Sequence, residues 1–178
     1  KSTPFDLFKH RIPWLMLLMV SATFTGMIIT SFEDALSLLP VLTAFIPMLM
    51  DTGGNCGSQS STMVIQGMAM EEIRLKDFFR VVFKEFRIAL ICSVILAAVN
   101  FVRIIFMYQN VKIAAIVSIT LIGTVILSKL LGCMLPMLAK KIHIDPAIMS
   151  APLLSTLVDS CSTLLYFTIA MKILNVAV

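Results

Sequence analysis

The sequence predicts an all-α polytopic membrane protein with five transmembrane helices per protomer. The 178 residues are 59% hydrophobic and only 13% charged, and their mean hydropathy of +1.00 far exceeds that of a soluble domain of this size. The apolar residues also gather into five segments that are each long enough to cross a hydrocarbon core of about 30 Å. A soluble globular domain is therefore excluded, and the net charge of +4 reflects the loops between the segments, not a nucleic-acid-binding surface.

The predicted spans follow a short connector, residues 1–11, whose apolar and basic side chains suit an interfacial helix that leads into the membrane. The chain begins with Lys1 and shows no cleavable signal, so we expect a longer protein with cytoplasmic regulatory domains upstream. The expected parts are thus the end of a connecting helix, residues 1–11, and a five-span pore domain, residues 12–178. The five spans are residues 12–32, 35–70, 88–108, 113–139 and 146–174.

Lysine and arginine are distributed unevenly between the two sets of loops, and this sets the predicted orientation. Because cytoplasmic loops are enriched in these residues, the N-terminus is expected in the cytoplasm. Lys129 belongs to neither set, since it lies within the fourth span, where it must reach the interface or pair with an acid. The predicted cytoplasmic side carries Lys1, Lys9, Arg11, Arg74, Lys76, Arg80, Lys84, Arg87, Lys140 and Lys141, and the opposite side carries Arg103, Lys112 and Lys172.

The second span contains a glycine-rich polar segment, residues 47–62, between two apolar stretches. As one helix, the 36 residues of this span would reach about 54 Å, well beyond the hydrocarbon core. We therefore expect the span to be broken at the glycines, with irregular backbone that lines water or a ligand. The alternative is that Gly53, Gly54 and Gly57 only allow close helix packing, while the neighbouring polar side chains form hydrogen bonds between helices.

Asp159 is the most informative single residue, because an acid within an apolar span is costly and usually functional. The fifth span begins at the Asp-Pro pair of residues 145–146, which places Asp159 about 20 Å into the membrane from the cytoplasmic side. Hydroxyl residues one turn before and one turn after it extend a polar stripe that resembles a pore wall. The alternative is a neutral Asp159 hydrogen-bonded within the bundle. The hydroxyl residues are Ser155, Thr156, Ser162 and Thr163.

The sequence predicts neither an enzyme nor a resident cofactor. The cysteines Cys56, Cys92, Cys133 and Cys161 have no Cys-x-x-Cys spacing, so zinc binding and a disulfide framework are not indicated. The glycine run lacks the Lys-Ser/Thr ending of a phosphate loop. Asp51-Thr52-Gly53 matches the triplet of aspartic proteases, but helix geometry places Asp51 and Asp159 about 10 Å apart along the membrane normal, too far for a catalytic dyad.

Residues 47–69, with their core Gly-Gly-Asn-x-Gly-x-Gln-x-x-Thr, resemble the signature of the MgtE family of magnesium channels. The connector, the five spans and the acid in the fifth span match the membrane domain of that family in order. The resemblance implies a homodimer in a bacterial inner membrane, with a pore along the two-fold axis between the copies. It also implies that upstream sensor domains close the pore through the connecting, plug-like helix.

The resemblance further implies which residues meet the ion. Asp159 matches the family acid that binds hydrated Mg²⁺, and Ser155, Gly54, Asn55 and Gly57 match positions that supply further oxygen atoms. Besides Mg²⁺ and other divalent cations, the expected partners are membrane lipid and a second copy of the chain.

The predicted function is a magnesium channel in which hydrated Mg²⁺ passes between two copies of Asp159. Two carboxylates match the charge of one divalent ion, and Mg²⁺ dehydrates so reluctantly that an ion held through its waters is chemically sensible. Two alternatives remain. The first is an ion-coupled secondary transporter that works by alternating access, and the second is a non-conducting membrane anchor for upstream domains.

Overall fold

A computed structural model describes residues 4–32 and 40–175, except for the side chains of residues 7, 10, 11 and 147–152. Every regular element in these ranges is helical, which confirms the all-α class. Residues 33–39, which include the expected start of the second span, lie outside the described residues, as do residues 1–3 and 176–178. The elements are α1 (Pro4–Ser31), the 3₁₀ helix η1 (Pro40–Phe45), α3 (Ile46–Ala69), the 3₁₀ helix η2 (Leu75–Asp77), α4 (Phe78–Tyr108), α5 (Val111–Lys141) and α6 (Pro146–Leu174).

Among the described residues, four segments are long and apolar enough to cross a membrane. They correspond to the first, third, fourth and fifth predicted spans. The helix in the second predicted span, α3, has 24 residues and a length of about 36 Å, but its polar centre keeps it outside this group. Hydropathy therefore confirms four of the five predicted spans and does not confirm the second. The four segments are Ile12–Ser31, Leu75–Tyr108, Val111–Lys141 and Leu153–Leu174.

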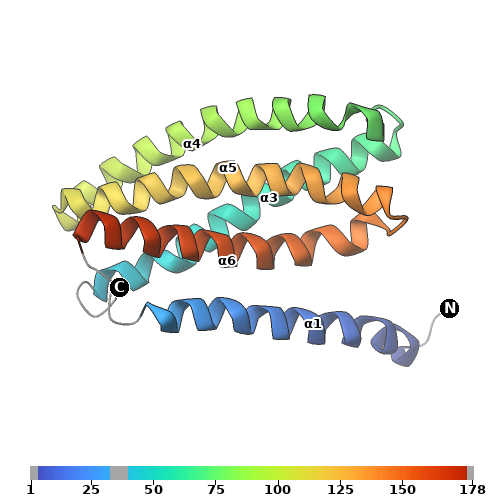
Figure 1. Ribbon diagram of the computed structural model, residues 1–178, viewed down its shortest axis with the longest axis horizontal. Helices are drawn as coiled ribbons and strands as arrows, with labels where there is room; N and C mark the ends of the chain where they lie inside the picture. The colour runs from blue at the N-terminus through green and yellow to red at the C-terminus, as the bar shows by residue number, and fades with distance from the viewer. Residues whose placement is uncertain (1–3, 33–39, 176–178) are drawn as a thin grey trace.

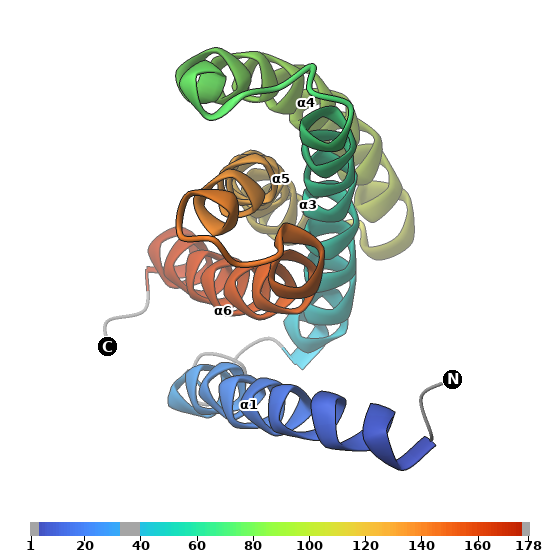
Figure 2. The same ribbon diagram turned by 90° about the vertical axis from the view of Figure 1, so that its right-hand side faces the viewer.

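The helix α5 lies at the centre of the fold, packed against α3, α4 and α6 (Figures 1 and 2). The helix α1 lies outside this group, along the outer side of α6 (Figure 2). Its contacts include a hydrogen bond of 2.8 Å between Thr25 Oγ1 and Ser160 Oγ. Just after the end of α1, the Phe32 ring stacks 4.7 Å from the Phe167 ring. Most of the apolar surface of α1 is left uncovered by the chain itself.

The main apolar core joins the start of α3 to α5 and α6. Leu42 and Leu49 are each 2% exposed, and Tyr166 and Phe167 on α6 are buried against the same cluster. The Tyr166 hydroxyl donates a hydrogen bond of 2.8 Å to the backbone carbonyl of Leu42, so its polar atom is satisfied inside the core. This core anchors η1 and the beginning of α3 against the end of α6.

A two-residue turn reverses the chain between α4 and α5. Gln109 adopts the left-handed conformation with φ 49°, which ends α4. The Asn110 side chain then accepts hydrogen bonds of 3.0 Å from the Lys112 N–H and 3.2 Å from the Ile113 N–H, as an N-cap does. This local chemistry explains why α4 and α5 are antiparallel neighbours.

The predicted break at the glycines is wrong, because α3 runs as one helix from Ile46 to Ala69. The change of backbone occurs earlier, where η1 passes into α3. A Cβ on Gly53 would lie 2.6 Å from Val158 Cγ1, and one on Gly57 would lie 2.6 Å from Ser128 Oγ. These glycines are part of a regular helix, and their lack of a side chain lets α3 approach α5 and α6 closely. This agrees with the alternative that the glycines serve helix packing.

This packing also corrects the expected depth of the glycine segment. Gly53 lies directly against Val158, the residue before Asp159. Asp51 and Asp159 are therefore at similar levels along the bundle, not about 10 Å apart as the separate helix lengths suggested. The error arose because the start of α3 cannot be placed from the sequence when the segment before it is not a regular α-helix.

Candidate ion site

Asp159 lies on α6, partly exposed, at the edge of a cavity of about 460 Å³ between α1, α3 and α6. Its neighbours in the cavity include two hydroxyl residues one turn earlier on the same helix, Ser155 and Thr156. The other walls are mainly apolar, so the few oxygen atoms are concentrated around the carboxylate. The remaining lining residues are Leu18, Ala22, Thr25, Gly26, Ile29 and Met50.

Only part of the polar stripe expected on α6 faces the cavity. Ser155 and Thr156 line it with Asp159, whereas Ser162 and Thr163 are 1% and 2% exposed and are turned into the bundle. Ser162 lies beside Gly53 of α3, and Thr163 Oγ1 donates a hydrogen bond of 2.7 Å to the Asp159 backbone carbonyl. The later half of the stripe is inward because α3 and α5 cross α6 there.

The helix α3 carries a second polar feature, which we call the α3 stripe: Asp51, Asn55, Gln59, Thr62 and Gln66. These residues recur every three or four positions, so they share one face of the helix, and all of them are exposed. Asn55 Nδ2 donates a hydrogen bond of 3.1 Å to Asp51 Oδ2. An exposed polar face on a helix of a membrane bundle needs water or another protein surface opposite it.

The three predicted site residues on α3 differ in their surroundings. Gly54 is half-buried, and a Cβ placed on it would meet nothing within 4 Å. Asn55 belongs to the α3 stripe. Gly57 is buried, and its backbone carbonyl lies against Gly132 of α5. The structure thus brings Asp159 and Ser155 together in one cavity, places Gly54 and Asn55 at or near an open polar face, and puts Gly57 in a helix crossing.

One copy of the chain supplies few ligand groups. Among the described residues, no three His, Cys, Asp or Glu side chains come close enough together to hold a metal ion. In the described part of the chain, Asp159 is therefore accompanied by hydroxyl side chains and not by a cluster of carboxylates. Such a sparse arrangement suits an ion that keeps most of its water shell.

The sequence interpretation did not include Thr25 of α1 in the site. This threonine lines the Asp159 cavity and connects α1 to α6 through Ser160. The available signal was the Thr-Gly pair of residues 25–26 in an otherwise apolar span, but no local pattern shows that α1 folds back beside α6.

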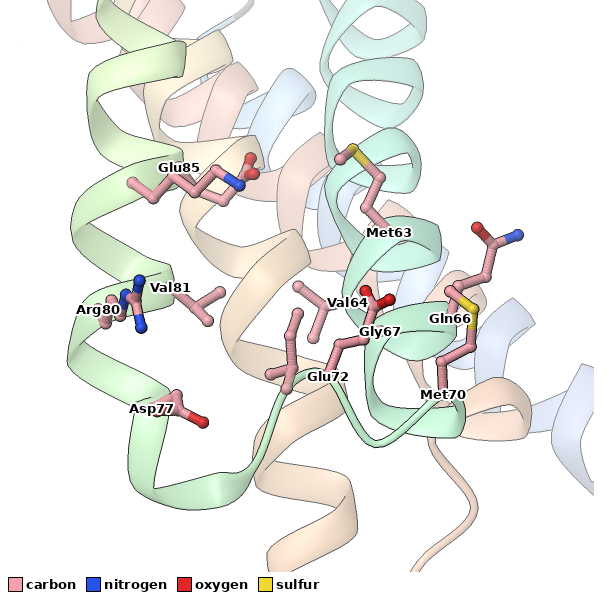
Figure 3. A pocket seen from close by; sticks show the side chains of 12 residues that line it. Met63, Val64, Gln66, Gly67, Met70, Glu72, Asp77, Arg80, Val81 and Glu85 are labelled. Atoms are coloured by element: carbon pink, nitrogen blue, oxygen red, sulfur yellow. The ribbon is translucent and has the colours of Figure 1, made fainter.

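The structure also gives Lys129 a partner. Its Nζ donates a hydrogen bond of 3.3 Å to Ser60 Oγ and lies 4.0 Å from Glu85 Oε2, while Ser60 Oγ donates to the same carboxylate oxygen at 2.6 Å. We call these three residues, from α3, α4 and α5, the buried triad. Glu85 also lines a separate cavity of about 520 Å³ between α3 and α4, and Figure 3 shows its side chain on α4. The triad does not line the Asp159 cavity.

Comparisons with known proteins indicate the same family as the glycine motif in α3. Residues 46–169 match the model of the MgtE family, described as a divalent cation transporter. The chain is 39% identical over 165 residues to the magnesium transporter MgtE of Bacillus subtilis, covering 90% of this chain and 36% of that protein. It is 32% identical over 172 residues to the magnesium transporter MgtE of Thermus thermophilus, covering 97% of this chain and 38% of that protein.

A third relative, the magnesium transporter MgtE of Enterococcus faecalis, is 28% identical over 167 residues, covering 94% of this chain and 37% of that protein. The chain thus spans little more than a third of the length of these relatives. Members of the family are transporters and not enzymes. Since the family model covers α3 to α6, where the glycine motif and Asp159 lie, this chain is a membrane protein that belongs to the MgtE family of divalent cation transporters.

Proposed function

We propose that this chain is the membrane part of a magnesium transporter and that two copies form a channel for hydrated Mg²⁺. The identity of the ion is inferred from the relatives, since all three are named magnesium transporters. The observation that carries the proposal is Asp159 itself: an acid in the middle of an apolar helix that borders a cavity lined by three hydroxyl residues, Thr25, Ser155 and Thr156. Acids at such positions commonly mark an ion pathway.

The need for a second copy follows from charge and from exposed polar surface. One Asp159 offers a single negative charge, whereas two offer the charge that balances Mg²⁺. The α3 stripe remains exposed in one copy, and a second copy facing it would enclose a hydrated passage between them. In this homodimer the two Asp159 carboxylates bind the waters of the ion, because Mg²⁺ gives up its inner waters reluctantly.

The other site residues support the ion in different ways in this proposal. Ser155 adds a hydroxyl beside Asp159, and Gly54 and Asn55 add polar atoms from the open side of α3. Gly57 acts indirectly, because its carbonyl is directed to Gly132 and its lack of a side chain keeps α3 close to α5. Bound Mg²⁺ is thus both the transported ion and a transient ligand of the pore.

We place the N-terminus in the cytoplasm of a bacterial inner membrane, as the basic residues indicate. We assign residues 1–11 to the connecting segment and residues 12–178 to the pore domain. The helix α1 continues from Pro4 to Ser31 without interruption, so a movement of upstream cytoplasmic domains would be transmitted along it. Its residues Thr25 and Gly26 border the Asp159 cavity, which gives such a movement a direct route to the ion.

The experiment is Mg²⁺ influx into liposomes that contain the chain and an internal Mg²⁺-sensitive dye. The Asp159→Asn variant keeps the side-chain shape but removes the charge, and we expect it to abolish most of the influx. Glu72→Gln removes an exposed carboxylate elsewhere, so it serves as the matched control and should conduct like the native chain.

Three other outcomes would contradict parts of the proposal. Normal influx through Asp159→Asn would exclude this carboxylate from the pathway. Influx that requires a Na⁺ or H⁺ gradient and saturates would favour an ion-coupled transporter. No influx of the native chain under any gradient or voltage would favour a membrane anchor.

A further inference from the structure

The N-terminal third of α4 carries three cations on one exposed face. Arg80, Lys84 and Arg87 follow each other at intervals of four and three residues, so they share a side of the helix over consecutive turns. They line a groove of about 400 Å³ together with Phe83, Ile88 and Ile91. We call this feature the basic groove.

None of these three cations has a partner within the described part of the chain. No ion pair or hydrogen bond to another described residue involves Arg80, Lys84 or Arg87. The nearest acid in sequence, Glu85, is 5% exposed and is held by Ser60. No carboxylate lines the basic groove itself within the described residues.

Two of the cations also border the cavity between α3 and α4 shown in Figure 3. Arg80 and Lys84 line that cavity beside the carboxylates of Glu72 and Asp77. Asp77 Oδ2 accepts a hydrogen bond of 3.0 Å from the Arg74 backbone N–H, and neither acid forms an ion pair with the groove cations within the described residues. The positive charge on the outer side of α4 is thus available to an anion from the surroundings.

The length of α4 places the basic groove at the level of the lipid headgroups. The helix has 31 residues and measures about 46 Å, which exceeds a hydrocarbon core of about 30 Å by some ten residues. The apolar part of the predicted span begins at residue 88, so the preceding turns extend beyond the core. Phe79 and Phe83, which are 82% and 64% exposed, are apolar side chains that can be covered by the acyl chains next to the headgroups.

We propose that the basic groove binds an anionic phospholipid. Its phosphate and negatively charged headgroup meet Arg80, Lys84 and Arg87, while the first part of an acyl chain lies along Phe83, Ile88 and Ile91. Guanidinium groups bind phosphate oxygens in pairs, and the lysine adds a compact charge between them. A general preference for basic cytoplasmic loops accounts for the side of the membrane, but not for three unpaired cations on one face above an apolar groove.

The test measures lipid binding to the full chain in neutral detergent. Phosphatidylglycerol and phosphatidylcholine with the same acyl chains are titrated, and bound lipid is counted by native mass spectrometry. The groove variant is Arg80→Gln/Lys84→Gln/Arg87→Gln. The control variant, Lys112→Gln/Lys141→Gln/Lys172→Gln, removes the same charge from exposed lysines that are scattered over α5 and α6.

We expect the native chain to prefer phosphatidylglycerol, and the groove variant to lose roughly 100-fold in its apparent association constant for that lipid. The control should lose less than about threefold. Equal losses in both variants, unchanged binding in the groove variant, or equal binding of the two lipids by the native chain would each overturn the proposal.

Two further measurements address misfolding of the triple variant and binding of phosphate alone. If the triple variant does not fold, single replacements of each groove cation by Gln are compared with single replacements of the control lysines, and each groove variant should bind less phosphatidylglycerol. Inorganic phosphate in excess should not displace the bound lipid, because it lacks the acyl chain. Complete displacement by inorganic phosphate would show an anion site instead of a lipid site.

Discussion

At the scale of single residues, the buried triad shows how a membrane helix can hold a lysine. Lys129 and Glu85 are 6% and 5% exposed, and Ser60 is 1% exposed. Each charge alone would be very costly in this environment. Together the lysine, the hydroxyl and the carboxylate satisfy one another, and they connect α5, α3 and α4 at one point.

This arrangement predicts a large difference between breaking the pair and removing it. Lys129→Met leaves the Glu85 carboxylate without its cation, so we expect the free energy of unfolding to fall by about 3 kcal/mol or more. The double variant Lys129→Met/Glu85→Leu removes both charges and should recover most of that loss. Unfolding in mixed micelles titrated with a denaturing detergent measures both values.

The control for this prediction is Lys112→Met, which removes an exposed lysine at the start of α5 and should leave stability nearly unchanged. A double variant that is as unstable as Lys129→Met would show that the loss does not come from leaving the Glu85 carboxylate without its cation. Stability equal to that of the native chain in Lys129→Met would show that the ion pair contributes nothing.

At the scale of elements, the three glycines of the α3 motif, Gly53, Gly54 and Gly57, are of two kinds. Gly53 and Gly57 face other helices at distances that leave no room for a side chain, and Gly132 on α5 faces the Gly57 carbonyl in the same way. Gly54 faces open space. The motif therefore combines close packing on one side of α3 with an open backbone on the other.

Replacing these glycines by alanine should separate the two roles. In Gly57→Ala the new Cβ would lie 2.6 Å from Ser128 Oγ and 3.0 Å from Leu154 Cδ2, so we expect a loss of about 1–3 kcal/mol in stability. Gly54→Ala should be neutral or slightly stabilising, since alanine favours the helix. If Gly54 borders the ion pathway, Gly54→Ala will still reduce Mg²⁺ influx.

Thermal unfolding and the liposome assay, applied to the same two variants, decide between these outcomes. A Gly54→Ala protein that is stable and conducts normally would remove Gly54 from the proposed pathway. A Gly57→Ala protein with native stability would mean that α3 and α5 can separate without cost.

At the scale of the whole molecule, the chain leaves unusual surfaces uncovered. The α3 stripe is polar and exposed, and α1 contacts the bundle along one side only (Figure 2). In a membrane, lipid can cover the apolar face of α1, but lipid chains cannot satisfy Asn55 or Gln59. The proposed second copy, with water between the two stripes, would resolve this mismatch.

Cross-linking tests the position of that second copy. Asn55→Cys on the α3 stripe should form a covalent dimer with a short bifunctional thiol reagent, because the two stripes face each other across the proposed axis. Val99→Cys lies on the outer face of α4 and is 65% exposed, so it should remain monomeric. The native chain measures cross-linking through its own four cysteines. Dimers from Val99→Cys alone would place the interface on α4.

The sequence by itself determined the features that depend on neighbouring residues. Asn110 caps α5, Pro146 begins α6, and the apolar runs between such signals become helices long enough for a membrane. Asp159 was recognisable as a candidate ion residue because an acid stands out in an apolar run wherever the helix packs. The glycine motif likewise indicated the family, because its residues follow one another closely along the chain.

Only the tertiary structure decided which residues meet across helices. It kept α3 helical through the glycines, turned Ser162 into the bundle, paired Lys129 with Glu85 and brought Thr25 of α1 to the cavity of Asp159. The physical reason is that helix formation depends on hydrogen bonds between residues four apart. Contacts between helices depend instead on close approach and on the pairing of buried polar groups from distant segments.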